Sequence, residues 1–209
     1  MMRRLYMLAL LLGLGACSGQ PPVPEDHYYR LPAPQATALA APLVPGPIFV
    51  EQFIADGIYH ERSIVYSPDG SSTDLLQHHY HFWAETPSVL LRDQLIDYLR
   101  AAGAAAVVVS SPDVVSDLSI YGSVRRFDRE LHGGSATVAV TLDIRVETKG
   151  GDAPLLVRAY EQRVDASGDD VGASIAAYGE ALTNIYGQLI ADIAANLSAL
   201  QPGRAVARR

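Results

Sequence analysis

The chain has 209 residues, of which 49% are hydrophobic, and its formal net charge is −7. This length is sufficient for one domain, or for one domain with an appendage. A single Cys excludes an intrachain disulfide framework. The excess of 23 acidic over 16 basic residues argues against a protein that binds the nucleic-acid backbone, which needs concentrated positive charge. The hydrophobic content argues against intrinsic disorder.

The only Cys follows a short apolar segment at the N-terminus. Two Arg residues precede the apolar residues 5–14, which is the layout of an export signal. This run is too short to span a hydrocarbon core, which needs roughly 20 apolar residues. Residues 14–17, Leu-Gly-Ala-Cys, resemble a bacterial lipobox. We therefore expect residues 1–16 to be a lipoprotein signal peptide that is cleaved before Cys17.

The resemblance to a lipobox implies that Cys17 is a lipid attachment site. Its thiol would carry a diacylglycerol and its new amine a further chain such as palmitate, and two or more acyl chains anchor a protein stably. Ser18 follows the cysteine, where an Asp would retain an enterobacterial lipoprotein in the inner membrane. This favours the periplasmic face of the outer membrane over the inner membrane. The alternative is an ordinary secretory signal with a Cys nearby by chance.

Proline marks the segment between the anchor and the folded body. Eight of the 13 prolines lie between Pro21 and Pro47. We expect residues 17–26 to form the acylated Cys and an extended linker, because Pro-rich chain favours polyproline II and resists packing. The folded body is predicted to cover residues 27–200. Residues 201–209 are predicted to be a disordered basic tail.

Hydrophobic periodicity predicts the elements of the first half of the body. Strands are predicted at residues 27–32, 48–53, 62–67, 75–83 and 104–109. A helix is predicted from Pro87 to Ala102, because Thr86 can cap it and an apolar side chain recurs at every third or fourth position. Gly103 suits the left-handed residue that closes such a helix.

The second half is predicted to contain three more strands and a long helix. The strands cover residues 117–130, 137–147 and 155–165. Apolar and polar residues alternate strictly in the second of them, as in a sheet with one wet face. In the first, regular alternation places Val124 and Phe127 on opposite faces. An amphipathic helix is predicted to end near Leu200. The fold class is therefore α+β, a single domain with a mostly antiparallel or mixed sheet and two amphipathic helices on one face.

Histidines at positions 78, 79 and 81 are the only pattern that suggests a metal site. On a regular strand His79 and His81 point the same way, about 7 Å apart, and could supply two ligands to zinc. A catalytic zinc usually needs a third protein ligand, and no spacing places the candidates Glu85 and His60. The interpretation that we favour is a polar, solvated strand face with no metal and no cofactor.

No other pattern predicts catalytic residues. The chain lacks a Gly-x-Ser-x-Gly elbow, and its paired glycines lead into strands instead of helices, so neither a hydrolase nor a phosphate-binding loop is indicated. Arg125, Arg126 and Arg129 form a basic cluster that could contact a lipid phosphate or a partner, or be a solvated face. Small residues beside the stripe of the C-terminal helix allow packing on its own sheet or a homo-oligomer.

Several motifs occur together in the order seen in a known family. They are Tyr28–Pro32, Ser63–Tyr66, Phe82–Pro87, Asp117–Gly122 and the alternating residues 138–146. With Cys17, they resemble the ABC-type transport auxiliary lipoprotein family, to which paraquat-inducible protein C belongs. The most characteristic motif contains Trp83, Glu85 and Pro87. His81-Phe82, before the Trp, departs from the pattern, since the family commonly has a basic residue beside the Trp.

The resemblance implies a small mixed α/β domain that is not an enzyme. It implies a periplasmic lipoprotein that works with an ABC transporter and an Mce-domain protein to move lipid between the two membranes. Trp83, Glu85 and Pro87 are then candidates for a partner-binding or core motif. Two alternatives stay open: an envelope-assembly or pilotin-type lipoprotein, and a zinc-dependent periplasmic enzyme that uses His79 and His81.

Overall fold

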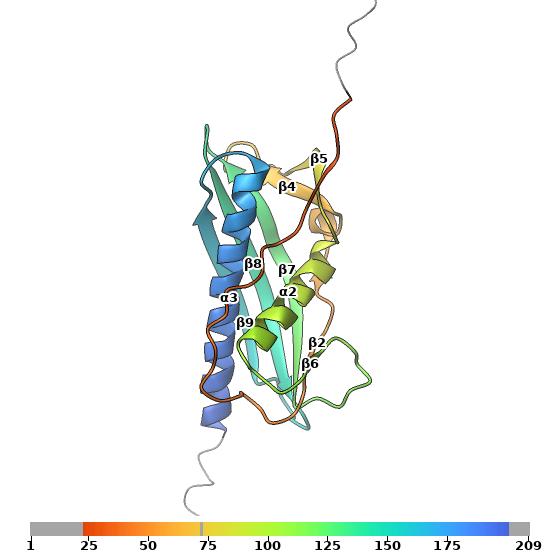
Figure 1. The fold of residues 1–209 in the computed structure, drawn as a ribbon, viewed down its shortest axis with the longest axis vertical. Helices are drawn as coiled ribbons and strands as arrows, with labels where there is room; N and C mark the ends of the chain where they lie inside the picture. The colour runs from red at the N-terminus through yellow and green to blue at the C-terminus, as the bar shows by residue number, and fades with distance from the viewer. Residues whose placement is uncertain (1–22, 72, 201–209) are drawn as a thin grey trace, which may run out of the picture.

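A mixed sheet with two helices on one face forms the body of the protein (Figure 1). The computed structural model describes residues 23–71 and 73–200. The strands are β1 (His27–Tyr29), β2 (Ile48–Val50), β3 (Ile54–Ala55), β4 (Ser63–Ser67), β5 (Leu76–Trp83), β6 (Val108–Val109), β7 (Leu118–Leu131), β8 (Ala136–Thr148) and β9 (Leu156–Asp165). The helices are α2 (Pro87–Ala101) and α3 (Val171–Ala199), with a 3-10 turn, η2 (Gly57–Tyr59). The predicted single α+β domain is confirmed.

Strand β7 joins the two halves of the sheet because it pairs along both of its edges. β8 lies antiparallel to one edge, and β9 lies antiparallel to the far edge of β8. Along the other edge of β7, the short strands β2, β3 and β4 pair with it in parallel, one after another. β6 extends the sheet from β2, and β5 and then β1 extend it from β4. The result is a mixed sheet whose long outer edge is β9.

Both helices begin where the sequence predicts, and α2 also ends at its predicted signal. Thr86 is extended at the start of α2, but its side chain makes no capping hydrogen bond and its hydroxyl lies 3.1 Å from that of Ser88, so the expected side-chain cap does not form. Pro87 takes the first position of α2, and Gly103 follows the helix with a φ of +66°. α3 begins after Asp170, whose carboxylate accepts a 2.9 Å hydrogen bond from the backbone N–H of Ala173. Such a cap satisfies one of the free N–H groups at a helix start. The two predicted helices are confirmed.

The segment after β1 crosses the helices before it enters β2 (Figure 1). Pro32 packs against Gly179 on α3, where a Cβ atom would lie 2.3 Å from the Pro32 Cγ. The Gln94 side chain on α2 donates a 2.8 Å hydrogen bond to the carbonyl of Pro32. Further along, the backbone N–H of Leu39 donates to the carbonyl of Ala102 at 2.8 Å. This part of the Pro-rich chain is therefore packed onto the body.

A bulge in β7 changes which of its side chains face the core. The register with β8 shifts between Val124 and Arg126. Phe127 therefore lies on the same side as Val124 and is only 1% exposed. The prediction that these two side chains lie on opposite faces is wrong, because an extra residue in a bulge interrupts regular alternation. The strand predicted at residues 104–109 is reduced to Val108–Val109.

The predicted anchor and tail lie outside the described residues. These are the signal peptide at residues 1–16, Cys17 with most of the linker, and residues 201–209. The first strand begins at His27, where the body was predicted to start. Within residues 23–71 and 73–200, no helix is both long enough and apolar enough to cross a bilayer.

Candidate functional site

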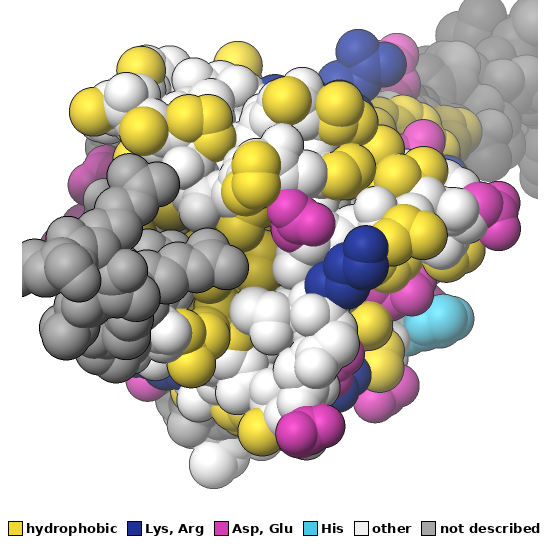
Figure 2. Space-filling view, turned by 90° about the horizontal axis from the view of Figure 1, so that it is seen from below, with side chains coloured by type: hydrophobic (Ala, Val, Ile, Leu, Met, Phe, Trp, Pro, Cys, Tyr) yellow, Lys and Arg dark blue, Asp and Glu magenta, His cyan; other side chains and the backbone are white. Residues whose placement is uncertain are grey.

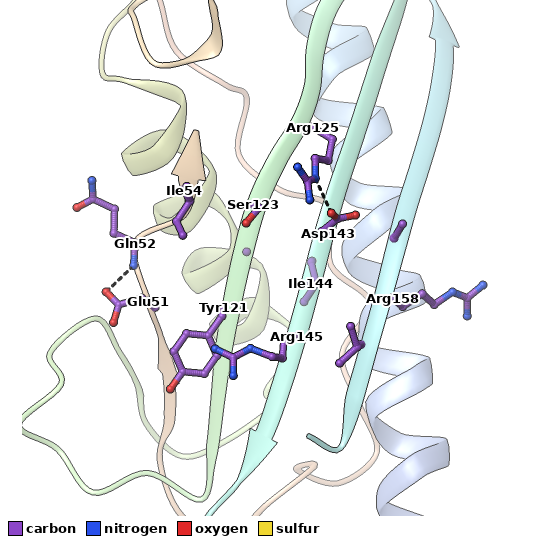
Figure 3. A pocket seen from close by; sticks show the side chains of 13 residues that line it. Glu51, Gln52, Ile54, Tyr121, Ser123, Arg125, Asp143, Ile144, Arg145 and Arg158 are labelled. Atoms are coloured by element: carbon purple, nitrogen blue, oxygen red, sulfur yellow. Dashed lines mark hydrogen bonds and ion pairs between the residues drawn. The ribbon is translucent and has the colours of Figure 1, made fainter. Parts of the chain in front are cut away.

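The face of the sheet that the helices leave bare is hollowed across β7, β8 and β9 (Figure 3). The hollow has a volume of about 480 Å³. Its side chains come from the segment of residues 51–54, from residues 121–125 of β7, from residues 143–145 of β8 and from the start of β9. Those that the argument uses are Ile54, Tyr121, Arg125, Asp143, Arg145 and Val157. α3 lies on the opposite side of the sheet, behind these side chains in Figure 3.

The arginine side chains of this hollow are already engaged with neighbouring groups. The Arg125 Nε lies 2.5 Å from an Asp143 carboxylate oxygen, and this hydrogen bond raises the pKa of Arg125. Arg145 lies over the ring of Tyr121, 4.3 Å from its centroid, and also pairs with Glu147. A cation above an aromatic ring is attracted by the ring's negative face. These pairs leave the hollow better suited to contacting another molecule than to acid–base chemistry.

Two exposed apolar side chains add to the contact potential of the hollow. Ile54 is 59% exposed and Val157 is 70% exposed, on opposite sides of it. Sequence reasoning missed this surface. The only sequence pattern that pointed to this surface was the polar set of alternating residues on β8. The pairing of Tyr121 with Arg145 depends on the register between β7 and β8, which cannot be read from the sequence.

Two buried carboxylates lie on the same face of the sheet as the hollow, at the part of β7 that η2 contacts. Asp128 is fully buried and Glu130 is 1% exposed. Arg126 bonds both carboxylates, with two 2.9 Å contacts to Asp128, and Arg163 on β9 pairs with Glu130. The hydroxyl of Tyr59 donates a 2.8 Å hydrogen bond to Asp128. Burial of the Tyr59 ring and, second, the negative charge of Asp128 raise the pKa of this tyrosine. The cluster therefore ties η2 and β9 to β7.

Arg129 lies on the other face of β7, where it is 1% exposed. Its guanidinium donates to the Ser174 hydroxyl at 2.7 Å, to His78 Nε2 at 3.0 Å and to the carbonyl of Asp169. Among the residues that the structure describes, no carboxylate lies within ion-pair distance of it. Burial and then the charge of Arg129 lower the pKa of His78 to about 4, so this imidazole is neutral.

The predicted basic cluster of Arg125, Arg126 and Arg129 is therefore wrong. Arg125 is exposed beside Asp143, Arg126 pairs with buried carboxylates, and Arg129 is buried on the opposite face. The bulge after Val124 separates these arginines, because each residue that follows it in β7 lies on the face opposite to the one that regular alternation predicts.

Beside His81, the structure places the ring of His78, with 5.2 Å between the centroids. The register between β4 and β5 explains this contact, because Ser63 pairs with Phe82 whereas Val65 pairs with Gln77. The residues of β5 between Gln77 and Phe82 therefore form a bulge. The ring of His79 lies beside the ring of Tyr80, instead of beside that of His81 as regular alternation predicts.

The candidate zinc ligands do not gather into a site. His79, His81, Glu85 and His60 were the residues considered for zinc. Over residues 23–71 and 73–200, no three His, Cys, Asp or Glu side chains are placed to hold a metal ion. Burial and then the charge of His27, whose ring stacks on His81 at 5.2 Å, lower the pKa of His81.

The Trp83–Pro87 motif lies at the junction of β5 and α2. The Trp83 ring is 1% exposed and lies 5.1 Å, between centroids, from the rings of both Phe127 and Tyr178. Pro87 is buried at the start of α2, whereas Glu85 is exposed in the connection. Trp83 and Pro87 therefore contribute to the core, and Glu85 is the member that a partner could reach.

A second apolar surface lies at the end of the body that carries β6. Val107 is 49% exposed beside this strand, and Val115 is 70% exposed in the loop that follows it. Figure 2 shows hydrophobic side chains spread over this end, with charged groups mostly toward its margins. Exposed apolar area of this kind is typical of surfaces that contact other molecules.

Comparisons with known proteins agree on the family. The sequence model of the family described as "ABC-type transport auxiliary lipoprotein component" matches residues 29–194. No curated protein matches the chain. The crystal structure of protein XCC0632 from Xanthomonas campestris is similar, with a TM-score of 0.73, 21% identity, and coverage of 84% of this chain and 100% of that one. A further crystal structure, of an uncharacterized protein, has a TM-score of 0.62 and 19% identity over 83% of this chain and 99% of its own.

At these identities, the two solved structures show that the fold is shared. The family match is broader evidence, because it spans the body from β1 to near the end of α3. This chain belongs to the family of ABC-type transport auxiliary lipoprotein components.

Proposed function

We propose that this protein is a lipid-anchored, periplasm-facing subunit of an ABC transporter that works with an Mce-domain protein. The system would move lipid, or another hydrophobic substrate, between the inner and outer membranes. The family match over residues 29–194 is the observation that carries this proposal. The role of the subunit is to dock the transporter parts, without catalysis of its own.

The anchor in this proposal is the acylated Cys17, and Ser18 directs the protein to the outer membrane. Nine residues, 18–26, connect Cys17 to β1. A Pro-rich chain of this length reaches about 30 Å at roughly 3 Å per residue. The body could therefore stand clear of the lipid surface while it remains tethered.

The chemistry of the bare sheet face supports docking over catalysis. Arg125 and Arg145 are both engaged with acidic neighbours, and the exposed side chains of Ile54 and Val157 offer apolar contacts. A surface that combines aromatic, arginine and apolar groups is typical of protein interfaces. We assign the hollow of Figure 3 as the surface that meets a periplasmic transporter subunit.

Lipid transfer between membranes tests this proposal. Phospholipid is pulse-labelled in cells that lack the gene and carry either wild-type protein, Cys17→Ser or Ser18→Ala, and the inner and outer membranes are then separated. We expect wild type and Ser18→Ala to restore the rate at which label moves between the membranes, and Cys17→Ser to leave it low. Equal rates in cells with and without the gene would contradict a role in lipid transport.

Membrane fractionation tests the anchor separately. Cys17→Ser should release the body from the membrane fraction, because the acyl chains can no longer be attached. Ser18→Asp should move it from the outer to the inner membrane fraction. Retention of Cys17→Ser in the membranes would contradict acylation at this residue.

A further inference from the structure

The strand that joins the tether to the body is held by few contacts. In the described sheet β1 pairs only with β5, over the three residues His27, Tyr28 and Tyr29. The carbonyl of Tyr29 also accepts a 2.7 Å hydrogen bond from the backbone N–H of Ala84. His27 and Tyr28 are exposed. Short elements with few buried contacts are the parts of a protein that open most readily.

Imidazole rings form much of the contact between β1 and β5. His27 stacks on His81, with 5.2 Å between the ring centroids and 14° between the ring planes. The hydroxyl of Tyr29 lies 2.9 Å from His81 Nδ1. The ring of His78 meets that of His81 edge-on, also with 5.2 Å between the centroids. Three imidazoles from the two strands therefore lie together at the point where the tether meets the body.

The charges nearest these rings favour neutral imidazoles. The buried Arg129 on β7 donates to His78 at 3.0 Å, and Tyr66 on β4 covers His78 with an uncharged ring at 4.4 Å. Asp169 and Asp170, at the start of α3, act on Arg129 only from beyond ion-pair distance. A proton added to this group of rings would therefore meet a buried positive charge with no carboxylate in contact with it.

The other side of the strand pair is held without an imidazole. Tyr28 stacks on Phe82 with 5.6 Å between the centroids, and Arg62 lies over the Tyr28 ring, 5.1 Å from its centroid. The Tyr28 hydroxyl donates to Asp26 at 3.4 Å. All four side chains are on or near the surface, so water can replace these contacts when the strand leaves.

We propose that acid releases β1 from β5 while the rest of the sheet stays folded. A proton on His27 or His81 adds positive charge where the two rings face each other. Burial, then the charge of His27, then that of Arg129 lower the pKa of His81, so the paired strand takes up this proton less readily than the released strand. At a pH below both values, each unit of this difference favours the released strand tenfold.

The released segment ends at Pro32. Gln94 donates to the carbonyl of this residue at 2.8 Å, and Gly179 packs against its ring. Five residues, 27–31, would thus join the chain between Cys17 and the body, which adds about 15 Å of reach at roughly 3 Å per residue. The longer reach rests on the proposed anchor at Cys17, whereas the release of β1 does not.

Hydrogen–deuterium exchange of the full-length protein in detergent, read by mass spectrometry of its peptides, tests the release. After correction for the intrinsic effect of pH, residues 27–31 should exchange several-fold faster at pH 5 than at pH 7.5. Peptides from β7 and β8 should stay protected at both values, because the pKa of His78 is lowered to about 4 and its bond to Arg129 persists at pH 5. Equal corrected rates at residues 27–31, or a parallel loss of protection in β8, would overturn the proposal.

Substitutions assign the response to the stacked pair. His27→Gln combined with His81→Gln should remove the pH dependence at residues 27–31, because Gln does not titrate. His27→Gln alone, at an exposed position, should reduce it. The matched control is His79→Gln, an exposed residue of the same strand β5, which should keep the full response. An unchanged response in the double variant, or its loss in His79→Gln, would overturn the proposal.

A disulfide between the two strands tests whether β1 itself must leave. Residues 28 and 82 lie opposite each other in the register, so Tyr28→Cys with Phe82→Cys can be bridged. The oxidised variant should exchange slowly at residues 27–31 at both pH values, and its reduced form should regain the acid response. A rise at pH 5 that is the same in the oxidised and reduced forms would contradict the release of β1.

Discussion

Acidification should destabilise the protein through His78. A guanidinium only donates hydrogen bonds, so the contact of 3.0 Å with Arg129 requires His78 Nε2 to be unprotonated. Burial, and then the charge of Arg129, lower the pKa of His78 from 6.5 to about 4. Protonation would remove this acceptor and place a second positive charge beside a buried guanidinium. His81, whose pKa is also lowered, adds to the effect in the same direction.

The sign and size of the effect follow from linkage. The unfolded chain binds this proton with a pKa near 6.5 and the folded chain with one of about 4, so acid favours the unfolded state between these values. Neutral His78 makes its full contribution to the free energy of unfolding above about pH 6.5, and this contribution is lost as the pH falls toward 4. The difference corresponds to at most about 3 kcal/mol. Solvent screening of a partly buried ring reduces it to roughly 1–2 kcal/mol, or roughly 2–8 °C in Tm.

Thermal unfolding measured by circular dichroism checks this between pH 7 and pH 4.5. We compare wild type with His78→Gln, whose amide oxygen can still accept from Arg129 but does not titrate, and with His60→Gln at an exposed position. The fall in Tm with pH should be clearly shallower in His78→Gln and unchanged in His60→Gln. Equal slopes in all three proteins would refute the assignment.

Three substitutions in the core have expected costs in the free energy of unfolding, measured by urea denaturation. Trp83→Ala should cost about 3–5 kcal/mol, because the ring is 1% exposed; a cost below 1 kcal/mol would place it outside the core. Gly179→Ala should cost about 1–3 kcal/mol, since the new Cβ would lie 2.3 Å from Pro32, and Pro32→Ala should recover part of it. Tyr186→Phe should cost about 1 kcal/mol through the lost bond to the Leu91 carbonyl, and no change would mean that water replaces this bond.

Elements with strong local signals could be predicted from the sequence. Pro87 at the first position and the closing Gly103 identify α2 without reference to the rest of the fold. The strict alternation in β8 is preserved because this strand lies between β7 and β9 with one face in the core. In such cases local sequence and tertiary packing favour the same structure.

Features that depend on strand pairing could not be predicted. The bulge after Val124 turns Phe127 to the core and buries Arg129 on the same side, against regular alternation. The bulge in β5 brings His78 to His81 in the same way. The hollow arises only when Tyr121 and Arg145 meet across β7 and β8. Register is decided by long-range contacts, so a periodicity read along one strand cannot reveal these contacts.

The most direct test of the proposed transport role is purification of the full-length, lipid-anchored protein from native membranes, with quantitative mass spectrometry of what accompanies it. The account predicts an ABC permease, its ATPase and an Mce-domain protein, enriched in constant ratio with the wild-type chain and depleted with Cys17→Ser. Enrichment of secretion or pilus subunits, with no transporter components above the background of a mock purification, would contradict it.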